Sequence, residues 1–146
     1  MSLKDWHQAA WLVEHETSPR EIGDLFALSD RDLESASASE LSPDWKHNIA
    51  YSAALSCAAI ALAASGYRPA RGQHHYRLIH SIPLTIGSEM EETARFLEAA
   101  RKKRNVGIYE RAGVISEGEA MEMLSLAKGL RRQVEDWIRT QHPKLL

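Results

Sequence analysis

The chain has one cysteine, Cys57, among its 146 residues, so it cannot form an internal disulfide. It also lacks the cationic start followed by an apolar run that is typical of a secretory signal. Both absences point away from export, and we expect a cytoplasmic protein. The sequence contains no pair of cysteines and no HExxH-like spacing, so it predicts neither a metal site nor a cofactor.

A large excess of charge is also lacking, since the formal net charge is -2. The charge is nevertheless uneven: residues 1–44 have 3 Lys/Arg against 10 Asp/Glu, whereas residues 45–88 have 4 against none. The second segment also holds His47, His74, His75 and His80. A local positive region on a mildly acidic protein fits a phosphate-bearing partner better than bulk capture of DNA.

Long hydrophobic runs are scarce, and the longest candidate is residues 49–67, IAYSAALSCAAIALAASGY. This segment carries no charge over a length that could cross a bilayer. Most of it is Ala and Ser, however, which gain little from transfer into hydrocarbon. We therefore expect no membrane partner, and interpret the segment as a central helix whose small side chains let neighbouring helices approach closely.

Strand-like alternation is absent, whereas helix-start signals recur. Ser18, Ser88 and Ser116 each precede a Glu by three positions, which predicts a capping box, and Ser42-Pro43 predicts a further start. Helical periodicity follows each signal. The Ser42 helix should run to Gly66, a length of about 35 Å.

A shorter helix is predicted through residues 76–82, broken near Pro83, and a weaker one near residues 6–13. The periodicity after Ser88 reaches residue 97, and we take residues 97–109 as helix. Residues 66–72, GYRPARG, are expected to form a tight polar connection. The fold class that follows is all-α, an antiparallel helical bundle of about four to six helices. We expect a single domain over residues 1–146, in which an acidic helical leader, residues 1–41, packs on the bundle of residues 42–146.

Residues 101–110, RKKRNVGIYE, carry four consecutive cations toward an Asn, a Gly and a Tyr. In a helix, Arg101, Asn105 and Tyr109 form one stripe with Arg104 beside it. Guanidinium, amide and phenol groups gathered in this way can grip phosphate or a nucleobase. A solvated basic helix end would explain the two lysines, but it would not explain the Asn and Gly, which are weak helix formers.

The motif RNVGIY, in the penultimate long helix of an all-α bundle, resembles the HEPN superfamily (higher eukaryotes and prokaryotes nucleotide-binding domains). The mark of that family is an Arg, usually followed by a polar residue such as Asn, and then a His a few positions on. Arg104 and Asn105 match this pattern, whereas Tyr109 stands where the His is expected. The segments SPDWKHNIAYSAAL, GYRPARGQHHYRLI, RKKRNVGIYE and ISEGEA together resemble bacterial HEPN-like proteins of unassigned role, over roughly residues 45–137.

This resemblance implies a bundle that often dimerises with the Arg motif near the dimer interface, so we expect a homodimer. Many members are metal-independent ribonucleases, frequently toxins beside a nucleotidyltransferase-type antitoxin, and others are binding modules without catalysis. An ordinary tyrosine is phenolate in only about one molecule in a thousand at pH 7, so Tyr109 is a poor base for a ribose hydroxyl. A histidine from elsewhere in the chain would have to supply that base.

The histidines that follow GYRPARG are the candidates. In an antiparallel bundle the start of one helix can lie opposite the end of the next long helix, so His75 can meet Arg104, within a protomer or across a dimer. We therefore predict that Arg104, Asn105, Tyr109 and His75 are catalytic. The predicted phosphate- or nucleotide-binding residues are Arg101, Arg68, Arg71, His74 and His80. The plainer alternative is a polar, partly exposed helix start.

The sequence thus predicts a nucleotide- or RNA-phosphate-binding protein. Its more specific form is a metal-independent RNase or toxin-antitoxin component with a degenerate motif. A competing interpretation is a non-catalytic dimeric protein-interaction module in which Arg104 is structural. A third is that Tyr109 accepts a nucleotide from a nucleotidyltransferase-type partner. We expect the four tryptophans to form core edges or dimer contacts rather than base-stacking platforms.

Overall fold

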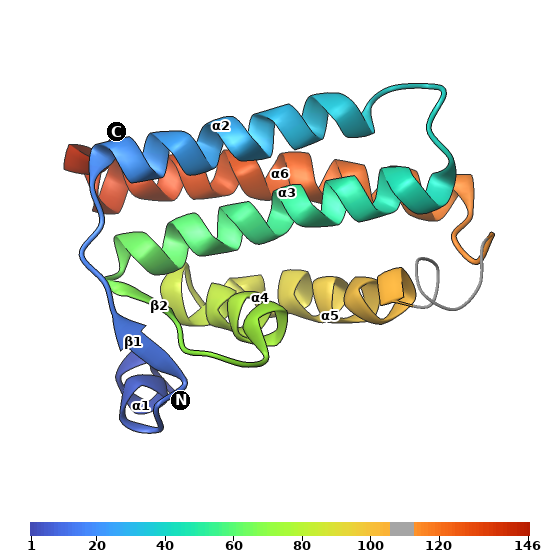
Figure 1. The fold of residues 1–146 in the computed structure, drawn as a ribbon. Helices are drawn as coiled ribbons and strands as arrows, with labels where there is room; N and C mark the ends of the chain where they lie inside the picture. The colour runs from blue at the N-terminus through green and yellow to red at the C-terminus, as the bar shows by residue number, and fades with distance from the viewer. Residues whose placement is uncertain (106–112) are drawn as a thin grey trace.

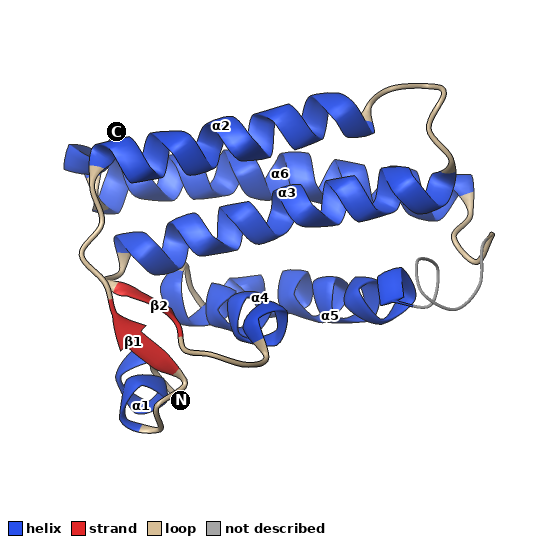
Figure 2. Ribbon diagram, viewed as in Figure 1, coloured by secondary structure: helices blue, strands red, loops and turns tan. Residues whose placement is uncertain are grey.

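The computed structural model describes residues 1–105 and 113–146. These residues form a helical bundle with a two-stranded sheet at one end, which confirms the predicted all-α class (Figures 1 and 2). The elements in chain order are α1 (Leu3–Gln8), β1 (Leu12–Glu14), α2 (Pro19–Ala36), α3 (Pro43–Ala64), β2 (Tyr67–Pro69), α4 (His74–Thr85), η1 (Ser88–Met90), α5 (Glu91–Asn105), α6 (Glu117–Gln141) and η3 (Pro143–Leu145), where η denotes a 3-10 helix.

The helices surround α3. Figure 1 shows α2 and α3 running antiparallel, and α5 and α6 likewise, while α4 is seen nearly end-on and crosses the others. α3 packs against α2, α6, α4 and α5. The acidic N-terminal region therefore supplies α2, which lies along α3 and also contacts α6.

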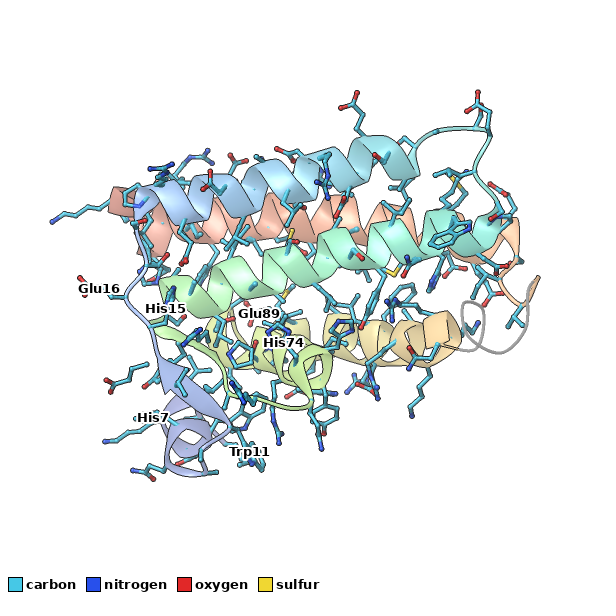
Figure 3. All side chains as sticks on the ribbon, viewed as in Figure 1. His7, Trp11, His15, Glu16, His74 and Glu89 are labelled. Atoms are coloured by element: carbon cyan, nitrogen blue, oxygen red, sulfur yellow. The ribbon has the colours of Figure 1, made fainter. Side chains whose placement is uncertain are left out.

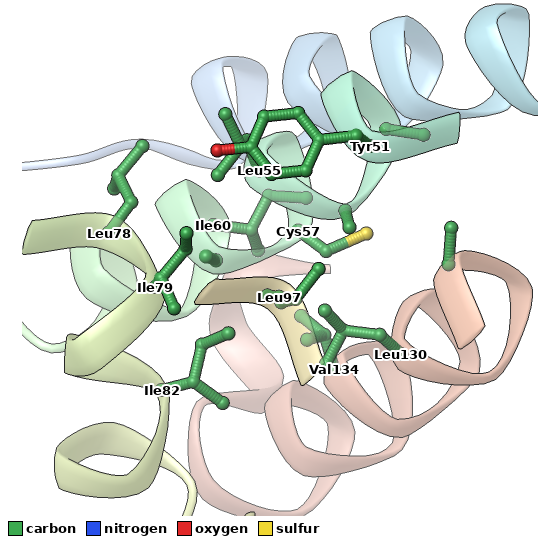
Figure 4. Close-up of a cluster of buried hydrophobic side chains, with 14 of the residues drawn as sticks. Tyr51, Leu55, Cys57, Ile60, Leu78, Ile79, Ile82, Leu97, Leu130 and Val134 are labelled. Atoms are coloured by element: carbon green, nitrogen blue, oxygen red, sulfur yellow. The ribbon is translucent and has the colours of Figure 1, made fainter. Parts of the chain in front are cut away.

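The composition of α3 follows from this central position. Ala53, Ala54 and Ala61 are fully buried, and such small side chains let the surrounding helices approach its backbone. Figure 4 shows larger side chains of α3, α4, α5 and α6 filling the space around them. α3 is long and apolar enough to cross a membrane by length and composition, but 67% of its most apolar window is buried inside the fold, as in the core helix of a bundle.

The ends of α3 form as the sequence predicts. The Ser42 hydroxyl accepts a hydrogen bond from the Trp45 amide, and Gly66 follows the helix at a φ of +96°, a conformation that favours glycine. Within α3, the buried Cys57 lies 3.4 Å from the Ser29 hydroxyl, and burial raises the pKa of its thiol to about 11. Cys57 is thus a small core residue rather than a reactive thiol.

The small sheet corrects two expectations. A helix was expected over residues 6–13, but α1 ends at Gln8, Ala10 adopts a φ of +65°, and residues 12–14 form β1. β1 pairs antiparallel with β2, which lies inside the expected polar connection, with Leu12 opposite Pro69. Three-residue strands are too short to show alternation, and only their pairing across the fold defines them.

The helix starts agree with the sequence in part. Ser116 and Glu119 form the predicted capping box, whereas Ser18 caps α2 without a reciprocal bond, because the Glu21 carboxylate accepts from Thr17 and pairs with His15. Ser88 is not a cap at all: it begins η1, and α5 starts at Glu91. α4 also continues past the expected break at Pro83, to Thr85.

Candidate functional site

The start of α4 and the last turns of α5 border an open pocket of about 560 Å³, which we call the α4–α5 pocket. Its lining residues come from two segments more than twenty residues apart in the sequence: Gln73, His74, His75, Tyr76, Arg101 and Asn105. Figure 3 shows His74 beside the first turn of α4. Four of the predicted site residues therefore lie around one pocket.

The first turn of α4 forms one side of this pocket. Gln73, its N-cap, adopts a left-handed conformation with a φ of +46° and makes no side-chain cap, and no acidic residue lies in the first turn. Helices α2, α3 and α6 are all capped by a serine and have an acid in this position. An uncapped helix start keeps its amide donors and its positive dipole end available for an anion.

Arg101 supplies a fixed positive charge on the opposite side. Its guanidinium donates to Glu98, with an Nη2–Oε1 distance of 2.5 Å, and His80 Nε2 lies 3.0 Å from the other carboxylate oxygen. Burial of Glu98 favours its protonated form, but the hydrogen bonds from Arg101 and His80 outweigh this effect and lower its pKa. Glu98 thus stays ionised and holds the Arg101 side chain at the pocket.

Arg104 lies behind the pocket wall. Its Nε donates to Asn48 Oδ1 at 2.5 Å, its Nη1 donates to Asn105 Oδ1 at 3.3 Å, and its guanidinium lies 5.6 Å from the centre of the Tyr51 ring. The bond to Asn105 fixes the amide of a pocket-lining residue. In this structure Arg104 therefore positions a neighbour and adds charge to the site.

His75 makes a neutral pair with the buried Tyr51. The Tyr51 hydroxyl lies 3.2 Å from His75 Nδ1. Burial, with the nearby Arg104, His74 and Arg101, lowers the pKa of His75, and burial raises the pKa of Tyr51 to about 12. At neutral pH His75 is therefore an uncharged imidazole that contacts the Tyr51 phenol. One ring nitrogen donates a hydrogen bond and the other accepts one, and the tautomer decides which of them faces Tyr51.

The remaining predicted residues are distributed differently. Arg68 lies on β2 near Glu21, and it lines another hollow with His15 and Leu25, which shares His74 with the α4–α5 pocket. Arg71 is exposed in the turn before α4 and makes no hydrogen bond or ion pair with the residues that the structure describes. His80 does not line the α4–α5 pocket, but it pairs with Glu98 and its ring lies 4.3 Å from that of the pocket-lining Tyr76. Tyr109 lies outside the described residues.

Three residues of this site were missed by the sequence interpretation: Asn48, Tyr51 and Glu98. Asn48 and Tyr51 are spaced by three, on one side of α3, at the start of an otherwise apolar stretch. A pair of polar side chains at helical spacing within a buried helix is a usable signal for a buried network. Glu98 precedes Arg101 by three positions, the spacing of an ion pair within a helix.

His47 leads to a prediction about the pH dependence of stability. It is buried, its Nδ1 has no hydrogen-bond partner among the described residues, and burial together with Lys103 and Arg104 lowers its pKa. His75 is shifted in the same direction. The unfolded chain therefore binds a proton at each of these histidines more readily than the folded protein does. As a result, the free energy of unfolding should fall as the pH drops below about 6.5.

Urea unfolding of the wild type and of His47→Gln, at several pH values between about 7.5 and 5, measures this effect. Each such histidine can contribute at most about 1.4 kcal/mol per pH unit to the slope, and we expect a shallower slope in His47→Gln. Carboxylates such as Glu98 titrate below this window, since their pKa is lowered. Equal slopes for the two proteins would contradict the prediction.

The chain matches no family model, no curated protein and no solved structure.

Proposed function

We propose that the protein binds the phosphate of a nucleotide or of RNA in the α4–α5 pocket. The observation that carries the proposal is the convergence of the uncapped α4 start with Arg101 and Asn105 around one open pocket. Backbone amides, a guanidinium and an amide side chain are all donors to phosphate oxygens. Glu98, the acidic neighbour of Arg101, does not line this pocket and is already hydrogen-bonded by Arg101 and His80.

The HEPN-like resemblance supports the same ligand class. Arg104 and Asn105, the residues that match the family motif, are bonded to each other at the rear of the pocket. His75, which the sequence interpretation offered as a replacement base, lies on the pocket wall and is neutral at pH 7 because its pKa is lowered. We accordingly include metal-independent RNA cleavage, in a cytoplasmic homodimer with a nucleotidyltransferase-type partner, as the extended form of the proposal.

A second candidate is a non-catalytic protein-interaction module. It is favoured by Arg104, whose Nε and Nη1 groups already donate to Asn48 and Asn105 within the protein. The exposed side chains of Trp45 and Met121, 54% and 48% accessible, would then belong to the contact surface. In that case substitutions at the α4–α5 pocket would leave the partner's affinity unchanged.

Replacement of Arg101 by Gln should lower the affinity for RNA at least about tenfold, because a charge-assisted hydrogen bond to phosphate is lost. Lys102→Gln is the matched control, since it removes the same charge from the neighbouring, exposed position of α5. Labelled RNA oligonucleotides are incubated with each purified protein without metal, and both binding and cleavage are scored. Circular dichroism checks that each variant is folded.

If Arg101→Gln and Lys102→Gln weaken RNA binding equally, only bulk charge matters, and the assignment of the binding site to the α4–α5 pocket is wrong. Arg104→Ala should weaken binding too, by releasing Asn105. If the wild type cleaves RNA, and His75→Gln abolishes cleavage but retains binding, His75 takes part in the reaction. Absence of both binding and cleavage would favour the protein-interaction module.

A further inference from the structure

A second hollow, of about 410 Å³, adjoins the α4–α5 pocket, and we call it the aromatic pocket. Its walls include Trp6, Trp11, Tyr76, Arg77, His80 and Leu84. Tyr76 lines both pockets, and Glu98 binds His80 of one and Arg101 of the other. The two pockets are therefore neighbours along α4.

The aromatic pocket is bordered by two pairs of contacting rings. Trp6 and Trp11 meet edge to face with their ring centroids 5.6 Å apart, and the rings of Tyr76 and His80 lie 4.3 Å apart. Trp11 lies at the end of the molecule that holds α1 and the small sheet, below α4 in the view of Figure 3. Aromatic side chains from two parts of the chain, the N-terminal segment and α4, thus border the same hollow.

A cation lies on these rings without an acidic partner. The Arg77 guanidinium is 3.9 Å from the centre of the Trp11 ring and 5.6 Å from that of Tyr76. Among the described residues, no carboxylate forms an ion pair with Arg77, although Glu91 also lines the pocket. A guanidinium stacked on an aromatic ring in this way offers a flat, positively charged platform on which another flat group can stack.

The chemistry of the two pockets together indicates the ligand. One pocket offers donors for phosphate, and its neighbour offers ring surfaces and a guanidinium plane, the groups on which nucleobases stack. The two pockets are also close along α5. Arg95 lines the aromatic pocket and Arg101 lines the α4–α5 pocket, and the two residues are six positions apart, about 9 Å along the helix axis. A purely apolar ligand would bring no negative charge to Arg77, and an acidic peptide would make no use of the aromatic rings.

We propose that the aromatic pocket binds a nucleobase that is covalently linked to the phosphate held in the α4–α5 pocket. The inference rests on the proposed function and specifies its ligand: a single-stranded oligoribonucleotide or a mononucleotide, rather than a free phosphate. Trp11 and Arg77 act in this arrangement as base-stacking residues, and Tyr76 separates the base from its phosphate.

Isothermal titration of the full chain, without metal, tests this with a short oligoribonucleotide and with an abasic ribose-phosphate strand of the same length. The abasic strand should bind at least about fivefold more weakly, because a stacked base contributes that factor or more. Trp11→Leu should reduce the affinity for the base-containing strand by a similar factor and leave abasic binding unchanged. Trp45→Leu is the control, since it removes an exposed tryptophan that lines neither pocket.

Arg77→Gln provides a second test if Trp11→Leu fails to fold, and quenching of tryptophan fluorescence by the base-containing strand alone provides a further readout. Equal affinity for the two strands, or equal weakening of both by Trp11→Leu, would overturn the base site while leaving the phosphate site intact. Binding of neither strand would overturn both. A mononucleotide that binds as tightly as the oligonucleotide would identify the ligand as a free nucleotide.

Discussion

Replacement of Leu97 by alanine is expected to lower the free energy of unfolding by about 2–5 kcal/mol. The buried residues of α5 are Ala94, Leu97 and Ala100, so Leu97 is the large side chain that fastens this helix to the core. It lies with Ile82 of α4 and Val134 of α6 in the cluster shown in Figure 4. Truncation should leave a cavity where three helices meet.

Leu28→Ala is the matched control, because Leu28 lies on α2 and is 37% exposed. The same loss of atoms there should cost less than about 1 kcal/mol. Urea unfolding measures both, and hydrogen exchange should show the largest loss of protection in α5, since α2, α3 and α6 keep their mutual contacts. Comparable losses for the two variants would show that α5 is not held by Leu97.

Neutralising Glu117 by Glu117→Gln should destabilise the fold by about 1–3 kcal/mol, because it leaves the buried Lys46 ammonium without its counter-charge. The Lys46 side chain is only 8% exposed, and its Nζ donates to Glu117 Oε1 at 2.9 Å. Glu117 is 60% exposed and keeps contact with water, so the cost stays below that of a fully buried pair. Lys46→Met, in contrast, removes the charge itself and should change stability by less than about 1 kcal/mol.

The double variant separates these effects. In the Lys46→Met background, Glu117→Gln should cost only the small interaction of a first-turn carboxylate with the helix dipole, about 0.3–1 kcal/mol. Glu122→Gln, on the exposed side of the same helix, serves as control. An equal cost of Glu117→Gln in both backgrounds would show that the ion pair does not matter.

The helical architecture could be predicted because it depends on local signals. Ser42 and Gly66 mark the two ends of α3, and Ser116 with Glu119 marks the start of α6, each through hydrogen bonds or backbone conformations within a few residues. The strands β1 and β2 could not be predicted in this way. Each is three residues long, and each exists because the other lies beside it.

The candidate site was predictable in residue types and only partly in arrangement. The basic run and the histidines after GYRPARG indicated Arg101, Asn105 and His75, and the structure places all three around one pocket. Arg68 and Arg71 belong to the same sequence segment, but neither lines this pocket: Arg68 lies on β2 beside another hollow, and Arg71 is exposed in the turn that follows. Sequence proximity alone could not separate these residues.

The sequence by itself determined the long helices α2, α3 and α6, the serines at which they start, and the small-residue character of α3, since hydrophobic periodicity and capping act over a few residues of chain. Only the tertiary structure decided that Asn48 and Tyr51 join Arg104 and His75 in one network, and that Trp11 meets Arg77. Such contacts depend on how helices and strands cross, which is set by packing over the whole core and not by any local pattern.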